Sequence, residues 1–413
     1  MGLLTTLRTY REMVSGASRA LWSYGPSITW LRRHRSWRAA WRFFRMKMMV
    51  TEGEGSLGAW YIYLRPLIKP FSRRFARYAP YPINVEFEIT TRCNKRCIVC
   101  EHTHWKESEP RQDLTWEQFL HIVNQFPRLI WTNLTGEGDA FLNKSYLDMI
   151  KYLKDRDVSV FLSDSFDLIT EDIARKLVEW RVDGIYLSMD AATPETYERL
   201  KVGCKFDRTL TNIKNLLRLK KEAGSPFPEL NFRYIVMTEN VQEMPAFVDL
   251  LGSLFREVGL EQKARLEFAG LLHFPAIEHY FLPEVPEEIV EATREAGERN
   301  GIPANYAHAS VDSLPPMKMC RAWMEPYIMM GGWVMPCCQV LQNNDRDYLR
   351  KNCLGNVFET DFRTLWNSER YRTYRELVAT PNGQVPALCK GCRAYDTKPR
   401  EEQFGIWYGN EES

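Results

Sequence analysis

The chain has 413 residues, more than one domain usually holds, so two or three structural units are expected. Its hydrophobic fraction of 45% is ordinary for a globular protein, and no run of about 18 apolar residues indicates a membrane-spanning helix. The net charge of +2 conceals an asymmetry: residues 1–80 contain 13 Arg and 2 Lys against 3 Glu, a net +12, which leaves −10 for the remaining chain.

The N-terminal segment, residues 1–82, is predicted to form basic helices with aromatic side chains on one face. Basic helices of this kind are typical of segments that lie in the interface of an anionic membrane, which is our first interpretation. Two others stay open: packing of the aromatic face on the rest of the protein, and RNA binding, the less favoured partner. One stripe comprises Trp30, Trp37, Trp41, Phe44 and Met48, and the second comprises Trp60, Leu64, Leu67, Phe71, Phe75 and Tyr78.

Residues 83–300 alternate between strand-like and helix-like patterns. Repeated β-α units predict a parallel sheet with right-handed crossovers. Six such units suit an α/β fold of the partial (β/α)6, TIM-like barrel class, with its active site at the carboxyl ends of the strands. The predicted strands are 84–90, 128–134, 158–163, 184–189, 231–237 and 264–270, and the predicted helices are 115–126, 144–156, 171–181, 206–222, 242–257 and 285–300.

Three cysteines, Cys93, Cys97 and Cys100, lie within eight residues directly after the first predicted strand. Three thiolates on one short loop can hold three irons of a [4Fe-4S] cubane and leave the fourth iron without a protein ligand. Because a reactive metal site keeps a coordination position open, this spacing predicts iron chemistry on a bound small molecule. A zinc knuckle whose fourth ligand lies elsewhere is the structural alternative.

This loop resembles the signature of the radical S-adenosylmethionine (SAM) superfamily, and the resemblance covers roughly residues 83–400. After the second predicted strand, residues 135–140 (TGEGDA) resemble the family's Gly-Gly-Glu-Pro segment. The resemblance implies that this segment contacts the methionine part of SAM, since small residues let the backbone approach the ligand and an acidic residue suits its ammonium. The implied contacts are Gly136, Glu137, Gly138 and Asp139.

Residues 187–197 (LSMDAATPETY) resemble the family's SxDGxxPExY segment at the end of the fourth predicted strand. Lys201 stands where relatives often place an arginine for the SAM carboxylate. Both Lys201 and the Asp139-Ala140 pair, in place of Glu-Pro, depart from the family pattern. The implied ribose contacts are Ser188, Asp190, Ser163 and Asp164.

Residues 301–413 resemble the auxiliary-cluster extension of the superfamily, known as a twitch domain in its short form and a SPASM domain in its long form. The closing C-x2-C pair is its most specific feature. The resemblance implies a second [4Fe-4S] cluster with four thiolate ligands, and a four-cysteine zinc site is the alternative. The implied ligands are Cys320, Cys337, Cys389 and Cys392; Cys338 could replace Cys337, Cys353 is spare, and Cys204 is expected to be a structural thiol.

The resemblance further implies an enzyme that cleaves SAM reductively to a 5′-deoxyadenosyl radical, which takes hydrogen from a substrate carbon. The auxiliary cluster would assist electron transfer, and a flavodoxin- or ferredoxin-type protein would donate the electron. The reaction type and any catalytic acid, base or hydrogen donor stay open.

The composition of residues 1–82 favours a membrane lipid, polyprenyl-linked or glycolipid substrate, since this segment does not resemble the leader-binding domain of peptide-modifying relatives. Peptide or protein modification, of the RiPP or sulfatase type, and sugar dehydrogenation are the alternatives. Ten cysteines without a secretion signal indicate the cytoplasm, with the protein peripheral on the inner face of the membrane. A zinc protein that binds RNA or membrane is the non-enzymatic alternative.

Overall fold

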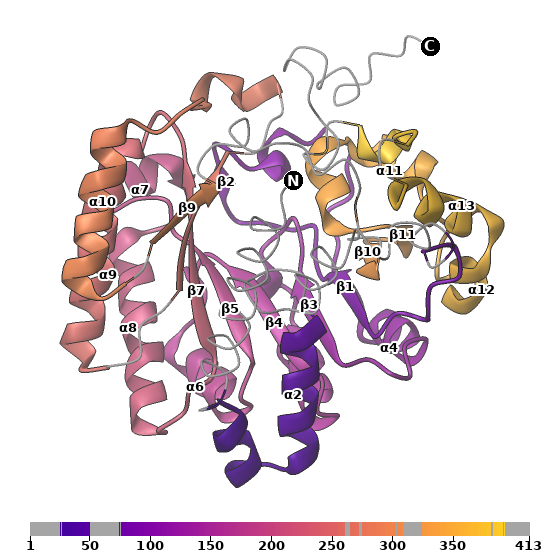
Figure 1. The fold of residues 1–413 in the computed structure, drawn as a ribbon, viewed down its shortest axis with the longest axis horizontal. Helices are drawn as coiled ribbons and strands as arrows, with labels where there is room; N and C mark the ends of the chain where they lie inside the picture. The colour runs from indigo at the N-terminus through magenta and orange to yellow at the C-terminus, as the bar shows by residue number, and fades with distance from the viewer. Residues whose placement is uncertain are drawn as a thin grey trace, which may run out of the picture.

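The computed structural model describes residues 27–49, 76–260, 265–271, 275–302, 304–308, 324–380 and 383–390, and the single residues 25, 74, 320 and 392. At its centre lies a nine-stranded sheet in the order β11-β10-β1-β3-β4-β5-β7-β8-β9 (Figure 1). Neighbouring strands are parallel throughout, except that β11 pairs with β10 in the antiparallel direction.

Every strand and helix predicted between residues 84 and 300 has a counterpart, and the sheet stays open between its two edge strands, so the partial barrel is confirmed. The strands are β1 (Asn84–Glu88), β3 (Trp131–Thr135), β4 (Ser159–Asp164), β5 (Gly184–Ser188), β7 (Glu229–Val236) and β8 (Arg265–Gly270). The helices that follow them are α4 (Trp116–Asn124), α5 (Tyr146–Asp155), α6 (Glu171–Glu179), α8 (Phe206–Glu222), α9 (Met244–Val258) and α10 (Glu287–Asn300).

Local chemistry sets the ends of these helices. Helix α4 begins with a capping box, in which the Thr115 hydroxyl accepts from the Gln118 backbone N–H and the Gln118 side chain accepts from the Thr115 N–H. Helices α9 and α10 both end at a glycine in the left-handed conformation, Gly259 with φ 67° and Gly301 with φ 61°. These short-range signals explain why the sequence located the helices well.

The sequence prediction missed several elements, and the shortest of them, of two or three residues, are too short to show a periodic pattern. Beyond residue 308, β10 and β11 extend the barrel sheet, so that sheet does not end at residue 300. The unpredicted elements are β2 (Arg96–Cys97), β6 (Lys201–Val202), α7 (Pro194–Leu200), β9 (Ala304–His308), β10 (Tyr327–Met329), β11 (Trp333–Met335), α11 (Arg346–Asn352), α12 (Phe362–Asn367) and α13 (Glu369–Val378).

Helix α2 (Trp37–Met49) covers the amino-terminal ends of the barrel strands, at the bottom of the view in Figure 1. Its buried residues Ala39, Ala40 and Phe43 pack in one cluster with side chains of β3, β4 and the loop before β7. In that cluster the rings of Phe43 and Phe227 meet edge to face with their centroids 5.6 Å apart. The floor of the barrel is therefore filled by the N-terminal segment.

The predicted aromatic stripe does not form one buried face. The helix breaks at Arg35 and Ser36, and the Ser36 hydroxyl accepts from the Ala39 N–H at 3.0 Å to start α2 anew. As a result Trp30 packs against Phe227 from a separate helical segment, whereas Trp37 and Trp41 are 70% and 58% exposed.

The second stripe falls mostly outside the described residues. In the part of the chain that the structure describes, no helix combines the length and apolar composition needed to cross a bilayer.

A buried arginine joins α11 to the first strand of the barrel. Arg346 donates to both carboxylate oxygens of Glu88, at 2.6 and 2.7 Å, and to Glu109 at 3.2 Å. All three side chains are at most 7% exposed. Glu88 also accepts from the Met330 backbone N–H at 2.6 Å, so this carboxylate fixes two C-terminal segments to β1.

Removing one partner from a buried ion pair leaves an uncompensated charge in the interior. Arg346→Met should therefore lower the free energy of unfolding by about 3–5 kcal/mol. The control Lys151→Met removes an exposed pair with Asp155 and should cost no more than about 1 kcal/mol. Anaerobic urea unfolding followed by tryptophan fluorescence measures both, and equal midpoints for the two variants would contradict the structural role of Arg346.

Candidate functional site

The three cysteines of the first motif lie on the loop that leaves the carboxyl end of β1. Cys97 belongs to the short strand β2, whose residue pairs are Arg96 with Val202 and Cys97 with Lys201. The Cys100 N–H donates to the Cys97 carbonyl at 3.1 Å, which closes a turn between these two ligands. None of these three cysteines forms a disulfide, and each residue is partly exposed.

The segment from Gly136 to Asp139 lies directly against the backbone of this loop. The N–H groups of Gly138 and Asp139 donate to the carbonyls of Thr90 and Arg92, at 3.3 and 2.8 Å. A Cβ on Gly138 would lie 2.3 Å from the Arg92 carbonyl oxygen, and one on Gly136 would lie 2.8 Å from that of Thr90. Only glycine permits this approach, which gives the motif a structural reason.

A buried lysine inside the cysteine motif ties the same two segments together. Lys95 forms an ion pair with Asp139, and both side chains are at most 5% exposed. Asp139 also accepts from the Phe141 N–H at 3.1 Å, so its carboxylate is engaged within the protein. Burial, reinforced by the nearby Asp139 charge, raises the pKa of Asp164 at the end of β4 to about 7.

Ser188, Asp190 and Lys201 come together at the carboxyl end of β5. The Lys201 ammonium lies 2.8 Å from the Asp190 carboxylate and donates to the Ser188 hydroxyl at 3.0 Å. Asp190 also accepts from the Ile235 N–H at 2.8 Å. Although burial opposes its charge, Lys201 has a raised pKa because Asp190 and Cys97 lie nearby.

This network bonds the three side chains to one another, and through the β2–β6 pair it holds the cysteine loop in place. Their contacts to SAM remain a prediction, as does that of Ser163, which is half-buried in β4.

Two glutamates lie next to each other beside the loop. Glu101, which follows Cys100, hydrogen-bonds to Glu137, and burial together with this neighbour raises its pKa well above the usual range. Burial also raises the pKa of Glu137, to about 6. Sequence reasoning assigned a contact to Glu137 but missed Glu101, Lys95 and the Glu88–Arg346 pair. Lys95 could have been found, since it lies between two of the cysteine ligands.

The four cysteines of the second motif lie near one another in the C-terminal part. Cys337 and Cys389 are 9% and 5% exposed. The pKa of Cys337 lies well above the usual range, first because of burial and then because of the neighbouring Cys320, Cys389 and Cys392. The Tyr374 hydroxyl lies 2.9 Å from the Cys389 sulfur. This donor set fits an iron–sulfur cluster in which every iron has a protein thiolate.

Among the described residues, no three Cys, His, Asp or Glu side chains are arranged to hold a single metal ion. In a cubane each of four thiolates binds a different iron, whereas one zinc ion would draw all four sulfurs to about 2.3 Å.

The remaining cysteines occupy different surroundings. Cys338 is hydrogen-bonded to Glu86 of β1, while its neighbour Cys337 lies with the other three thiols. Cys353 is buried in the same small core as Cys337. Cys204 is 1% exposed in the main core, where burial raises its pKa to about 11, so its expected structural role is confirmed.

Two family models match the chain. The radical SAM superfamily model matches residues 87–251, and an iron–sulfur cluster-binding domain model, SPASM, matches residues 320–393. Together they include all seven predicted ligands and most of the sheet.

Named relatives agree with these matches. The chain is 26% identical to the tungsten-containing aldehyde ferredoxin oxidoreductase cofactor-modifying protein of Pyrococcus furiosus, over 75% of this chain and 86% of that protein. It is 24% identical to the AdoMet-dependent heme synthase of Methanosarcina barkeri, over 76% and 91%, and 24% identical to the mycofactocin maturase MftC of Mycolicibacterium smegmatis, over 43% of each. These relatives are enzymes, which removes the non-catalytic zinc protein as an interpretation.

Solved structures show the same fold. SuiB of Streptococcus suis bound to S-adenosylmethionine superimposes with a TM-score of 0.55 at 14% identity, over 77% of this chain and 73% of that one. The structure titled anSMEcpe with bound AdoMet gives a TM-score of 0.51 at 17% identity, over 76% and 84%. The chain belongs to the radical SAM superfamily, and a SPASM iron–sulfur domain follows its catalytic barrel.

Proposed function

We propose that this radical SAM enzyme takes hydrogen from a carbon of a membrane-borne substrate: a lipid, a polyprenyl-linked molecule or a glycolipid. When bound, a cluster on Cys93, Cys97 and Cys100 supplies the electron that cleaves SAM, and the auxiliary cluster assists electron transfer. The backbone cradle at Gly136 and Gly138 would orient the methionine end of SAM. A flavodoxin- or ferredoxin-type protein is the proposed electron donor.

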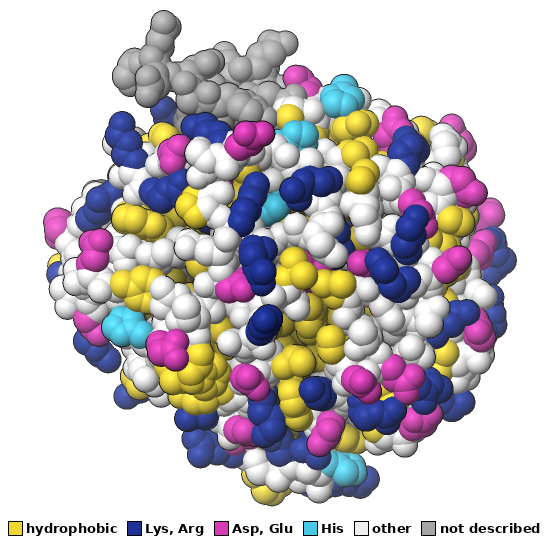
Figure 2. Space-filling model, turned by 180° about the vertical axis from the view of Figure 1, so that it is seen from behind, with side chains coloured by type: hydrophobic (Ala, Val, Ile, Leu, Met, Phe, Trp, Pro, Cys, Tyr) yellow, Lys and Arg dark blue, Asp and Glu magenta, His cyan; other side chains and the backbone are white. Residues whose placement is uncertain are grey.

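The membrane proposal rests on the exposed tryptophans on the outer face of α2. Trp37 and Trp41 are exposed there, on a helix whose other face is fixed to the barrel, and Arg32 lies over the Trp37 ring at 5.2 Å. Indole rings beside arginines favour the interface of an anionic membrane. By contrast, Figure 2 shows basic and acidic side chains interspersed over the face opposite to the view of Figure 1.

The position of α2 restricts how such a substrate could reach the radical. The cysteine loop lies at the carboxyl ends of the strands and α2 fills the amino ends, so the route cannot pass through the floor of the barrel. A lipid would have to enter from the carboxyl end of the barrel. The proposed location is the cytoplasm, with the protein peripheral on the inner face of the membrane.

Peptide modification is the second candidate, because the mycofactocin maturase is among the relatives. The two candidates differ in whether activity requires a membrane. Untargeted lipid and metabolite comparison of a deletion strain with its parent would separate them, since a peptide-modifying enzyme would leave the lipid profile unchanged.

Removing the cysteine ligands of each cluster in turn should distinguish the roles of the two clusters. Cys93→Ala, Cys97→Ala and Cys100→Ala should each abolish 5′-deoxyadenosine formation with dithionite and lower the iron content from about eight to about four. The pair Cys389→Ala and Cys392→Ala should spare this cleavage more than substrate turnover. Cys338→Ser is the control and should retain about eight irons; if it loses four while Cys337→Ser does not, the ligand is Cys338.

The two glycines that lie against the cysteine loop, Gly136 and Gly138, should not tolerate replacement by a residue with a side chain. Gly138→Ala should lower SAM cleavage at least about tenfold, because its Cβ would press on the Arg92 carbonyl and displace the cysteine loop. Gly25→Ala, where a Cβ would contact nothing within 4 Å, is the matched control and should keep full activity. Wild-type cleavage in the Gly138 variant would contradict the cradle.

Membrane attachment should depend on the exposed indoles. The double variant Trp37→Ser, Trp41→Ser should lose most of its recovery in flotation with phosphatidylglycerol vesicles, because it lacks the interfacial aromatic groups. Val202→Ser removes another exposed hydrophobic side chain, 44% exposed, from the opposite end of the barrel, and should float like the wild type. If the wild-type chain itself stays with the unbound protein, the membrane proposal is wrong while SAM cleavage can still be measured.

A further inference from the structure

One helix of the C-terminal part, α13, contacts two of the four cysteines proposed to hold the auxiliary cluster. The Cys320 N–H donates to the Val378 carbonyl at 2.8 Å, and the Tyr374 hydroxyl lies 2.9 Å from the Cys389 sulfur. The first contact uses backbone atoms, which any residue would supply. The second depends on one side chain, so the residue type at this position decides what the Cys389 sulfur meets.

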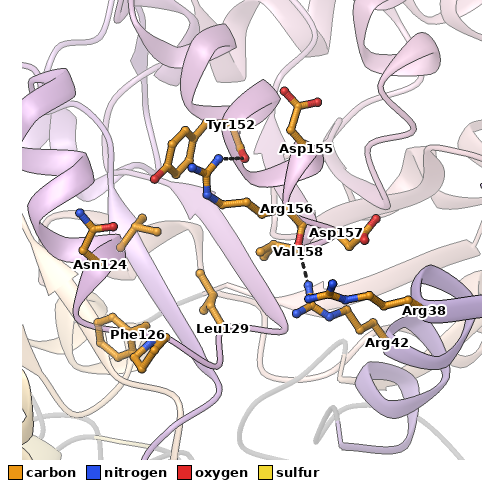
Figure 3. Close-up of a pocket in the computed structure, with 12 residues that line it drawn as sticks. Arg38, Arg42, Asn124, Phe126, Leu129, Tyr152, Asp155, Arg156, Asp157 and Val158 are labelled. Carbon is orange, nitrogen blue, oxygen red and sulfur yellow. Dashed lines mark hydrogen bonds between the residues drawn. The ribbon is translucent and has the colours of Figure 1, made fainter. Parts of the chain in front are cut away.

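The position of α13 is fixed by aromatic packing against the barrel. The Tyr371 ring of α13 and the Trp366 ring of α12 have their centroids 4.7 Å apart, and the Phe362 ring lies 5.9 Å from that of Trp366. Phe362 in turn lies 4.6 Å from Phe126, the residue after α4 that also lines the pocket drawn in Figure 3. The helix is thus held against the barrel by a continuous chain of rings, which limits its movement relative to the auxiliary thiols.

The contact between Tyr374 and Cys389 is shielded from solvent. The two residues are 8% and 5% exposed, and both belong to the main hydrophobic core. A hydrogen bond in such surroundings is stronger than the same bond in water, because the low local dielectric screens the two partners less.

Iron binding would fix the direction of this hydrogen bond. A thiolate that ligates iron carries no proton, so its sulfur can only accept and the Tyr374 hydroxyl must donate. One-electron reduction of a [4Fe-4S] cluster adds negative charge, which its sulfur ligands share. A donor to one of these sulfurs therefore stabilises the reduced form more than the oxidised form, and the reduction potential rises.

We propose that Tyr374 raises the reduction potential of the auxiliary cluster by donating a hydrogen bond to Cys389. A higher potential makes the cluster a better electron acceptor and a poorer electron donor. The proposal rests on the auxiliary cluster of the proposed function and adds to it a residue that acts through a ligand. It applies equally to a lipid and to a peptide substrate.

The same helix offers a matched control. Tyr371 is a second buried tyrosine of α13; burial raises the pKa of its hydroxyl, and the nearby Cys337 thiol does so too. Among the residues that the structure describes, this hydroxyl has no hydrogen-bond partner. Tyr371→Phe and Tyr374→Phe therefore each remove one buried hydroxyl near the auxiliary thiols, and the second variant also removes a hydrogen bond to a ligand.

The test measures the potential of the auxiliary cluster in the full-length protein, purified without oxygen. Electron paramagnetic resonance follows reduction by dithionite in the presence of redox dyes. The signal that persists in the triple variant Cys93→Ala, Cys97→Ala, Cys100→Ala identifies the auxiliary cluster, and iron content shows which variants hold both clusters. A further variant carries 3-fluorotyrosine in place of Tyr374, because it keeps the shape of the ring and is a stronger hydrogen-bond donor.

In Tyr374→Phe we expect the equilibrium constant for reduction of the auxiliary cluster to fall about tenfold, which is a shift of about 59 mV to lower potential for one electron. Tyr371→Phe should change this constant less than about twofold. The fluorotyrosine variant should shift the potential in the opposite direction, to a higher value, since a loss of packing could not produce opposite signs.

An unchanged potential in Tyr374→Phe would overturn the proposal and leave the auxiliary cluster in place. Equal shifts in the two phenylalanine variants would also overturn it, because buried polarity rather than the hydrogen bond would be responsible. Loss of the cluster from Tyr374→Phe, or shifts of the same sign with phenylalanine and fluorotyrosine, would assign the residue a structural role instead. A wild-type protein with only about four irons would lack the auxiliary cluster itself, and that part of the proposed function would fall with this inference.

Discussion

The structure depends on how the cysteine loop is fixed from two sides. On one side, Gly138 and Asp139 donate backbone hydrogen bonds to the residues just before Cys93. On the other, β6 pairs with β2, so the backbone of Lys201 lies opposite that of Cys97. The buried pairs Lys95–Asp139 and Lys201–Asp190 then add side-chain bonds to both contacts. Three thiols on a free loop would hold a cluster poorly, whereas this loop has little freedom left to lose on binding one.

The sequence predicted what depends on short-range patterns. Strand and helix periodicity located the barrel, and the spacing of Cys93, Cys97 and Cys100 located the reactive end of it. It could not predict the partners of buried charges, because Lys95 with Asp139 and Arg346 with Glu88 are separated by 44 and 258 residues. The family resemblance also did not indicate the ion pair between Lys201 and Asp190, because a sequence motif identifies residue types but not their contacts in space.

The N-terminal segment shows where helical periodicity misleads. A single helix through residues 30–48 would align Trp30 with Trp37 and Trp41, but Ser36 interrupts it and caps a new helix. The alanines of α2 then let the helix approach the barrel closely, and Phe43 supplies the bulk that fills the floor. The same segment therefore contains buried and exposed tryptophans. Trp30 packs against Phe227 of the barrel, whereas Trp37 and Trp41 remain at the surface.

The direct pairing of β10 with β1 fixes the spacing between the two groups of cysteines. Because Glu86 and Phe87 pair with Tyr327 and Ile328 in one continuous sheet, the auxiliary thiols are placed relative to the first cysteine loop by strand register. A slip of one residue in this register would shift that spacing by about 3.3 Å without changing any cysteine.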